Sequence, residues 1–75
     1  MDRQKVKSSQ IASVGWTGDT MEVEFHQGGV FRYPGVPRHV YEGMMKSPSV
    51  GSYFHTHVKT AKRADGKPLY PHTKV

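Results

Sequence analysis

The sequence contains no cysteine among its 75 residues. This absence excludes a disulfide framework, a thiolate nucleophile and every zinc site that needs sulfur ligands, and it fits a reducing compartment. No run of residues approaches the roughly 20 apolar residues that span a bilayer. The first ten residues are polar and lack the apolar stretch of a signal peptide. We therefore expect a cytoplasmic protein with no membrane partner.

The chain is also too short for a large core, because 75 residues are enough for one domain and not for two. A chain of this length buries only about 60–65% of the surface that its unfolded form exposes. Its core is therefore small. Because self-association would add buried area, formation of a homo-oligomer is one expectation.

The motifs of catalysis and metal binding are also missing. No G-x-S-x-G pattern surrounds any serine. Glu22 and Glu24 share one side of a predicted strand, where they are expected to be solvated carboxylates. His55 and His57 are two positions apart in a predicted helix, so they point about 200° apart and cannot chelate one ion. We expect neither an enzyme nor a cofactor or metal site, and we expect His57 to pack half-buried against the core.

The formal charge of +5 is unevenly distributed. Between residues 8 and 58, four acidic residues slightly outnumber three basic ones, whereas residues 1–7 and 59–75 hold the excess of lysine and arginine. Basic ends act as arms rather than as a uniform steering field. Any contact with nucleic acid is therefore expected to involve the two ends of the chain.

Three strands are predicted in the first half of the chain. Residues 11–16 are rich in side chains that favour strands, and residues 17–20 supply turn chemistry. Residues 21–25 alternate apolar and polar, with Met21, Val23 and Phe25 on one side. Gln27-Gly28-Gly29 predicts a hairpin turn before the strand at residues 30–33. Phe31 and Tyr33 then share one face, and Arg32 faces the other side.

Two short helices are predicted next. Pro37 suits the first turn of a helix that ends before Ser47-Pro48, and Ser49 is the expected N-cap of a second helix with an apolar stripe from Val50 to Val58. The predicted fold is α+β: a three-stranded antiparallel meander followed by two short helices packed on one face. Residues 1–6 form a basic extension, residues 7–59 the domain, and residues 60–75 a basic, largely irregular arm pinned by Leu69 and Tyr70.

The order and spacing of several short motifs resemble the KTSC domain family. They are Lys7-Ser8-Ser9-Gln10-Ile11, Val14-Gly15-Trp16, Met21-Glu22-Val23-Glu24-Phe25, Gly29, Phe31-Arg32-Tyr33, Val36-Pro37, Ser47, Gly51, Tyr53 and Phe54. The family's usual signature is Tyr-x-Tyr, for which this sequence has Phe31 in the first position. Its usual tyrosine after Val-Gly is Trp16 here. The resemblance implies a small domain that is found at the C-terminus of some lysyl-tRNA synthetases and in stand-alone bacterial and phage proteins. It implies no established activity.

Two functions are consistent with these residues. The first is binding of RNA or another single strand, in which exposed aromatics stack on bases and basic arms contact phosphates. The candidate residues for this role are Trp16, Arg32, Tyr33, Lys59, Lys62, Arg63 and Lys67. The second is a protein-interaction module, such as an accessory or phage-encoded factor, in which the aromatics anchor a protein partner. Core packing of the same rings, above all Phe31 and Phe54, and a solvated basic tail are the alternatives to both.

Overall fold

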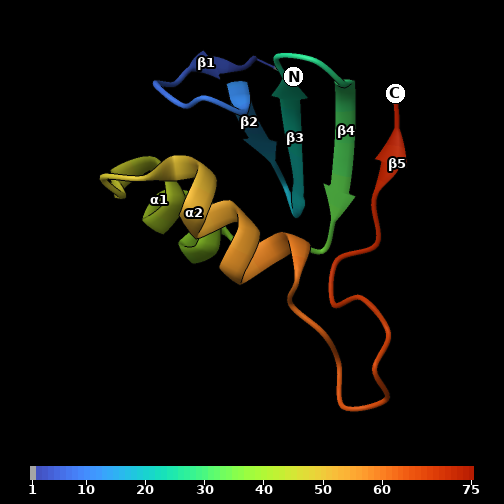
Figure 1. The fold of residues 1–75 in the computed structure, drawn as a ribbon. Helices are drawn as coiled ribbons and strands as arrows, with labels where there is room; N and C mark the ends of the chain where they lie inside the picture. The colour runs from blue at the N-terminus through green and yellow to red at the C-terminus, as the bar shows by residue number, and fades with distance from the viewer. Residues whose placement is uncertain (1) are drawn as a thin grey trace.

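The computed structural model describes residues 2–75, which form an antiparallel sheet with helices on one of its faces (Figure 1). The sheet contains five strands in sequence order: β1 (Gln4–Lys5), β2 (Ile11–Thr17), β3 (Thr20–Phe25), β4 (Gly29–Pro34) and β5 (Thr73–Lys74). Between β4 and β5 the chain forms α1 (Arg38–Lys46), α2 (Val50–Phe54) and the π-helical turn η1 (His55–Lys59).

The central meander β2–β3–β4 follows the predicted turns. Thr17 pairs with Thr20 across the first hairpin, and Phe25 pairs with Gly29 across the second. Gly18 and Gly29 have φ values of +68° and +82°, in the left-handed region that is unfavourable for residues with a Cβ atom. Glycine at these two positions therefore allows the tight connections that set the register of the sheet.

The prediction of a three-stranded sheet is incomplete, because the two ends of the chain add an edge strand each. Gln4 of β1 pairs with Val14, and Lys74 of β5 pairs with Phe31. Each edge strand has only two residues, so neither carries an alternating pattern that a sequence could show. They pair because the meander already offers unpaired backbone groups on both edges.

The core lies between the sheet and the helices. Its buried apolar side chains are Ile11, Val14, Met21, Val23, Tyr33, Val36, Met44, Val50, Phe54 and Val58. The predicted alternation in β3 is confirmed for Met21 and Val23, which are fully buried on the helix-covered face. Phe54 contacts Tyr33 edge-on, with ring centroids 5.3 Å apart, and this contact ties α2 to β4.

The second predicted helix begins as expected and ends differently. The Ser49 side chain accepts a hydrogen bond from the Ser52 amide at 3.4 Å, which makes Ser49 the N-cap. After Phe54, however, the helix widens into η1. His57 is exposed rather than half-buried, and its ring lies against Tyr53 with centroids 4.1 Å apart. The helical spacing that placed His57 on the apolar stripe does not hold in a π-turn.

Candidate functional site

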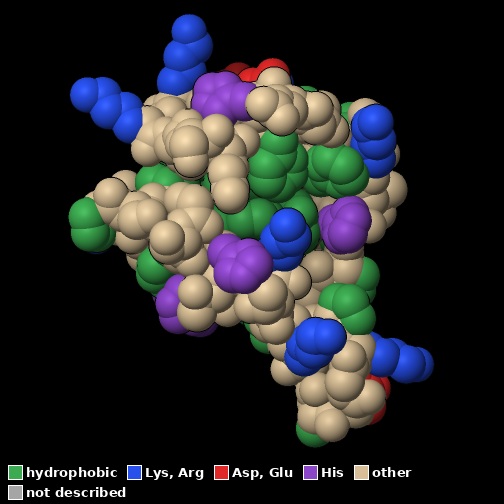
Figure 2. Space-filling model, viewed as in Figure 1, with side chains coloured by type: hydrophobic (Ala, Val, Ile, Leu, Met, Phe, Trp, Pro, Cys, Tyr) green, Lys and Arg blue, Asp and Glu red, His purple; other side chains and the backbone are tan. Residues whose placement is uncertain are grey.

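A cavity opens on the helix-covered face of the sheet, beyond the end of η1. Its volume is about 430 Å³, and its walls are Phe25, Phe31, Tyr33, Lys59, Pro68, Tyr70 and His72. In the space-filling view it lies within the central hydrophobic area, with lysine and histidine side chains beside it (Figure 2). Five of the seven lining residues have ring systems with a flat π-face, and one is a cation.

The sheet wall of the cavity is a set of contacting rings. Phe31 lies edge-on to Phe25 at 5.7 Å and to His72 at 5.4 Å between centroids. His72 also contacts Tyr33, at 5.5 Å and an interplanar angle of 39°. These aromatic contacts hold the rings in place, so the wall is largely formed without a ligand.

Tyr33 has a second property that matters at this wall. Only 5% of the residue is exposed, and this burial raises the pKa of its phenol above the ordinary value near 10. The hydroxyl is protonated at neutral pH, as an ordinary tyrosine hydroxyl is, and can donate a hydrogen bond.

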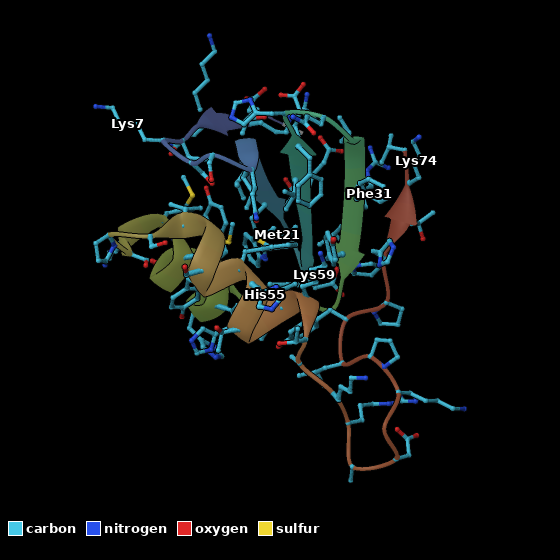
Figure 3. The ribbon with its side chains drawn as sticks, viewed as in Figure 1. Lys7, Met21, Phe31, His55, Lys59 and Lys74 are labelled. Atoms are coloured by element: carbon cyan, nitrogen blue, oxygen red, sulfur yellow. The ribbon has the colours of Figure 1, made fainter. Side chains whose placement is uncertain are left out.

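The π-turn η1 positions Lys59, the cation that lines the cavity. Thr60 donates two hydrogen bonds to the carbonyl oxygen of His55, from its amide at 3.0 Å and from Oγ1 at 2.8 Å. These bonds close the wider turn that ends at Lys59, whose side chain lies at the rim of the cavity (Figure 3).

The C-terminal segment forms the opposite wall. Residues 61–69 fold back on themselves, with the Leu69 amide donating to the Ala61 carbonyl at 2.9 Å and the Arg63 amide to the Lys67 carbonyl at 2.8 Å. Pro68, Tyr70 and His72 then reach the cavity before β5 joins the sheet. Tyr70 is half-buried against the core. The predicted pinning by Tyr70 is confirmed, whereas Leu69 is 43% exposed.

The structure brings some of the predicted site residues together and separates others. Tyr33 and Lys59 both line the cavity. Lys62, Arg63 and Lys67 are exposed in the folded-back segment next to it, where Arg63 forms an exposed ion pair with Asp65 at 3.2 Å. The four basic residues therefore lie at the rim of the cavity or in the segment that follows it, and Tyr33 lies in its wall.

Trp16 and Arg32 do not belong to this group. The Trp16 indole donates its Nε1 hydrogen to the Val36 carbonyl at 2.8 Å and stacks on Tyr41 with centroids 6.1 Å apart. These contacts fix Trp16 between the end of β2 and α1 as a packing residue. Arg32 lies on the opposite face of the sheet from Phe31 and Tyr33, as the strand alternation predicts.

Sequence reasoning missed Phe25, Phe31, Pro68, Tyr70 and His72 as cavity residues, and it assigned Phe31 to core packing. Alternation placed Phe25 on the same face as the core, so one wall was visible in the pattern. The wall from residues 68–72 was not visible, because nothing in an irregular basic segment shows where it packs. The only signal was the pair of apolar side chains Leu69 and Tyr70 in an otherwise polar stretch.

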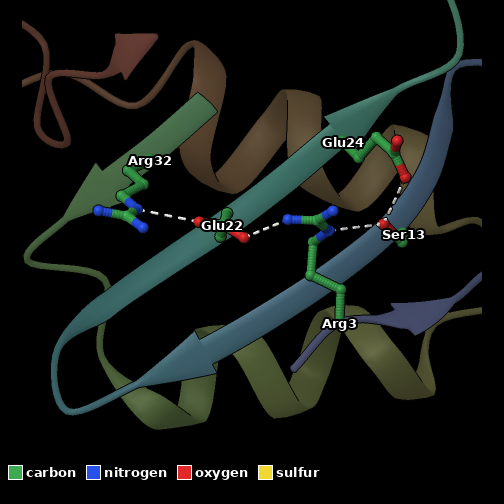
Figure 4. Close-up of polar contacts among 5 residues, drawn as sticks. All are labelled: Arg3, Ser13, Glu22, Glu24 and Arg32. Carbon is green, nitrogen blue, oxygen red and sulfur yellow. Dashed lines mark hydrogen bonds and ion pairs between the residues drawn. The ribbon is translucent and has the colours of Figure 1, made fainter. Parts of the chain in front are cut away.

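The opposite face of the sheet has a buried acid at its centre. Glu22 is only 3% exposed, so the expectation of a solvated carboxylate is wrong for this residue. One carboxylate oxygen accepts from Arg32 Nε at 2.9 Å, and the other accepts from Arg3 Nη1 (Figure 4). The hydrogen bond from Arg32 is the main cause of a lowered Glu22 pKa; burial opposes it and Arg3 reinforces it.

Within residues 2–75, no three histidine or acidic side chains converge in a way that could hold a metal ion. No helix in the same range is long and apolar enough to cross a membrane. The residues that are concentrated at one place are aromatic rings and lysines.

A family model of the KTSC domain matches residues 7–61 of the chain. The chain belongs to the KTSC domain family. It resembles the crystal structure of a KTSC domain protein from Yersinia pestis, with a TM-score of 0.84 and 29% identity over 99% of this chain and 96% of that one. An uncharacterized protein of Stutzerimonas stutzeri (strain A1501) is 34% identical over 56 residues, which are 72% of this chain and 79% of the relative.

Membership of the KTSC domain family agrees with the resemblance found in the sequence motifs. The residues matched by the family model include the Phe31-Arg32-Tyr33 triplet and Lys59, but they end before Pro68, Tyr70 and His72. The cavity of this KTSC domain therefore has one wall inside the matched segment and one wall beyond it.

Proposed function

We propose that this KTSC domain is a non-catalytic module that binds single-stranded nucleic acid, with RNA in the cytoplasm as the expected ligand. The observation that carries the proposal is the open cavity walled by Phe31, Tyr33, Tyr70 and His72 with Lys59 at its rim. Unpaired bases bind to proteins by stacking on aromatic side chains, and nearby cations contact the phosphates.

The volume and the chemistry of the cavity suit one base better than a helix or a duplex. A cavity of about 430 Å³ admits a flat ring system with part of its sugar. His72 is exposed and lies against Phe31 and Tyr33, so a base can stack on it without displacing the core. The Tyr33 hydroxyl and the Lys59 ammonium are hydrogen-bond donors at the same place.

The positive charge lies where such a strand would continue. Lys62, Arg63 and Lys67 are exposed in the segment that follows Lys59, and Lys74 is exposed in β5 on the other side of the cavity. Arg63 is partly neutralised by Asp65, which leaves the lysines as the main phosphate contacts. Compared with the interface expected from the sequence, Trp16 and Arg32 are replaced by His72 and Tyr70.

A binding assay with labelled single-stranded RNA of about ten nucleotides tests the proposal on the full chain. Affinity measured by fluorescence anisotropy should fall steeply between about 50 mM and 200 mM salt. His72→Ala should weaken binding about tenfold, because stacking contributes roughly 1–3 kcal/mol per base. Lys59→Gln should weaken binding and lower the salt slope by about 0.7, the value for one lost phosphate contact on a single strand.

Two exposed residues of α1 provide matched controls. His39→Ala and Lys46→Gln change the same residue types away from the cavity and should leave affinity unchanged. Absence of binding at low salt, or equal losses in the cavity and control variants, would contradict the proposal. Truncation at Lys59 is a poor test, because it also removes β5 and half of the cavity wall.

The alternative is a protein-interaction module. The exposure of two apolar side chains favours it: Leu69 is 43% and Val75 is 62% exposed, and both lie in the C-terminal segment. A protein partner that contacts this surface would be sensitive to Leu69→Ser and Val75→Ser but insensitive to salt. RNA binding should show the opposite dependence.

A further inference from the structure

A second hollow lies on the face of the sheet opposite the aromatic cavity. It is open to solvent, has a volume of about 500 Å³, and is lined by Thr17, Thr20, Arg32, Pro34 and Thr73. These residues come from β2, β3, β4 and β5, because Thr17 pairs with Thr20, Thr20 with Pro34, and Arg32 with Thr73. The hollow is therefore built on paired strands rather than on loops.

Arg32 is held in one orientation by the buried acid beneath it. Its Nε donates to Glu22 Oε1 at 2.9 Å, which fixes the plane of the guanidinium (Figure 4). The two terminal nitrogens have no hydrogen-bond acceptor among residues 2–75. About half of the side chain is exposed. An arginine in this state offers a planar, prealigned pair of donors.

An anion at this place would be held by hydrogen bonds from Arg32 rather than by a net positive charge. Glu22 is shared between Arg32 and Arg3, so Arg32 has only one of its nitrogens engaged by a carboxylate. Glu24 accepts a hydrogen bond from Ser13 at 2.9 Å and lies further along β3, where it pairs with Val30 and does not line the hollow. Asp19 lies in the turn beside the hollow and accepts from the Thr20 hydroxyl at 3.2 Å.

The hydroxyl of Thr73 adds a donor beside the guanidinium. Thr73 pairs with Arg32 across β4 and β5, and its side chain has no hydrogen-bond partner among the described residues. Thr20 is directed toward Asp19, and Thr17 lies on β2, two strands away from Arg32. Arginine with a neighbouring threonine hydroxyl suits phosphate oxygens, which accept several hydrogen bonds in a fan.

We propose that the part of the hollow beside Arg32 and Thr73 is a binding site for a phosphate group. The inference is independent of the aromatic cavity, because it rests on different residues on the other face of the sheet. A free phosphorylated molecule and a nucleic-acid backbone both carry this group, and the arms of the experiment distinguish these two sources.

Titration of the isotope-labelled full chain with inorganic phosphate, followed by NMR, tests the site. We expect saturable shifts of the Arg32 Nε–Hε signal and of the Thr73 amide, which chloride at equal ionic strength does not reproduce. Thr73→Val removes one hydroxyl, leaves both ion pairs of Glu22 in place, and should weaken phosphate binding about fivefold to tenfold. Thr56→Val in η1 is the matched control and should bind as the unmodified chain does.

Three results would overturn the proposal: equal shifts with chloride, shifts confined to residues 62–67, or unchanged affinity in Thr73→Val. The source is identified by repeating the RNA assay with Thr73→Val. Weaker RNA binding assigns the site to a backbone phosphate, whereas unchanged RNA binding together with weaker phosphate binding assigns it to a free phosphorylated molecule. His72→Ala reports on the aromatic cavity alone. An error in the proposed RNA binding and an error in the proposed phosphate binding can therefore be told apart.

Discussion

At the scale of single residues, Glu22 links the N-terminal end of the chain and β4 to the middle of the sheet. Arg3 comes from the residues before β1, and Arg32 comes from β4. The carboxylate side chain is 4% exposed, so water screens these ion pairs weakly on the Glu22 side. A buried charge with two hydrogen-bonded partners stabilises the arrangement only while the carboxyl stays ionised.

Glu22 predicts how stability depends on pH. Its pKa is lowered in the folded state, so its contribution is complete above the unfolded value of about 4.3 and is lost as pH falls through the folded value. Glu22→Gln should reduce the free energy of unfolding by roughly 1–3 kcal/mol at neutral pH, and the difference from the unmodified chain should shrink near about pH 3. Urea denaturation at both pH values measures this.

The matched control for this prediction is Glu42→Gln. Glu42 is 45% exposed and pairs with Arg38 at 3.1 Å within α1, so its replacement should cost less than about 0.5 kcal/mol. A Glu22→Gln variant whose destabilisation is the same at both pH values would show that the ionised carboxylate does not contribute.

At the scale of elements, the contact between α1 and α2 depends on a glycine. Gly43 lies in the middle of α1, and the Tyr53 ring of α2 lies directly above it. A Cβ atom at this position would be 2.9 Å from Tyr53 Cζ and closer still to the hydroxyl oxygen. The sequence alone shows only a residue that weakens the helix, whereas the structure shows what the missing side chain makes room for.

Gly43→Ala therefore has two opposing effects on the free energy of unfolding. Alanine favours the helix by about 1 kcal/mol, but the clash displaces Tyr53 and its stacking on His57. We expect the clash to dominate and the free energy of unfolding to fall by about 1 kcal/mol. In a Tyr53→Ala background the same substitution should become stabilising. Thermal or urea unfolding of the four proteins measures this, and a stabilising Gly43→Ala in the unmodified chain would contradict it.

At the scale of the whole molecule, both edges of the sheet come from the two ends of the chain, which surround a near-neutral middle. β5 pairs with β4, and the Val75 amide donates to the Val30 carbonyl at 2.9 Å. Together with Tyr70, these contacts hold the second wall of the aromatic cavity against β4. The same strand contributes Thr73 to the hollow on the other face. β5 is therefore part of both candidate sites.

Removal of residues 73–75 should release the C-terminal wall of the aromatic cavity from the sheet. The buried core lies entirely between residues 11 and 58, so the domain should remain folded. The amides of residues 61–70 should exchange with solvent at least tenfold faster, because the segment loses its anchor at the sheet. Hydrogen exchange followed by NMR measures this. Unchanged exchange would show that Tyr70 and the bonds to Ala61 hold the wall alone, and loss of the folded spectrum would show that β5 is essential to the core.

Much of the central fold was predictable because its signals are local. Alternation in residues 21–25, turn glycines at 18 and 29, and the Ser49 cap each act over a few neighbouring residues. The family motifs lie in the same stretch, so the family was recognisable from residues 7–59. The alternation also placed Phe31 and Tyr33 on one face and Arg32 on the other, which the structure confirms.

Tertiary structure decided what depends on contacts between distant residues. Glu22 is buried because Arg3, 19 positions earlier, reaches it, and no local pattern shows such a partner. The aromatic cavity exists because residues 68–72 pack beside β4, and the phosphate hollow exists because Thr73 pairs with Arg32. The sequence by itself thus determined the strands, the turns and the faces through short-range chemistry. The packing of the two ends onto that sheet determined both candidate sites, because edge pairing depends on backbone groups that carry no sequence pattern.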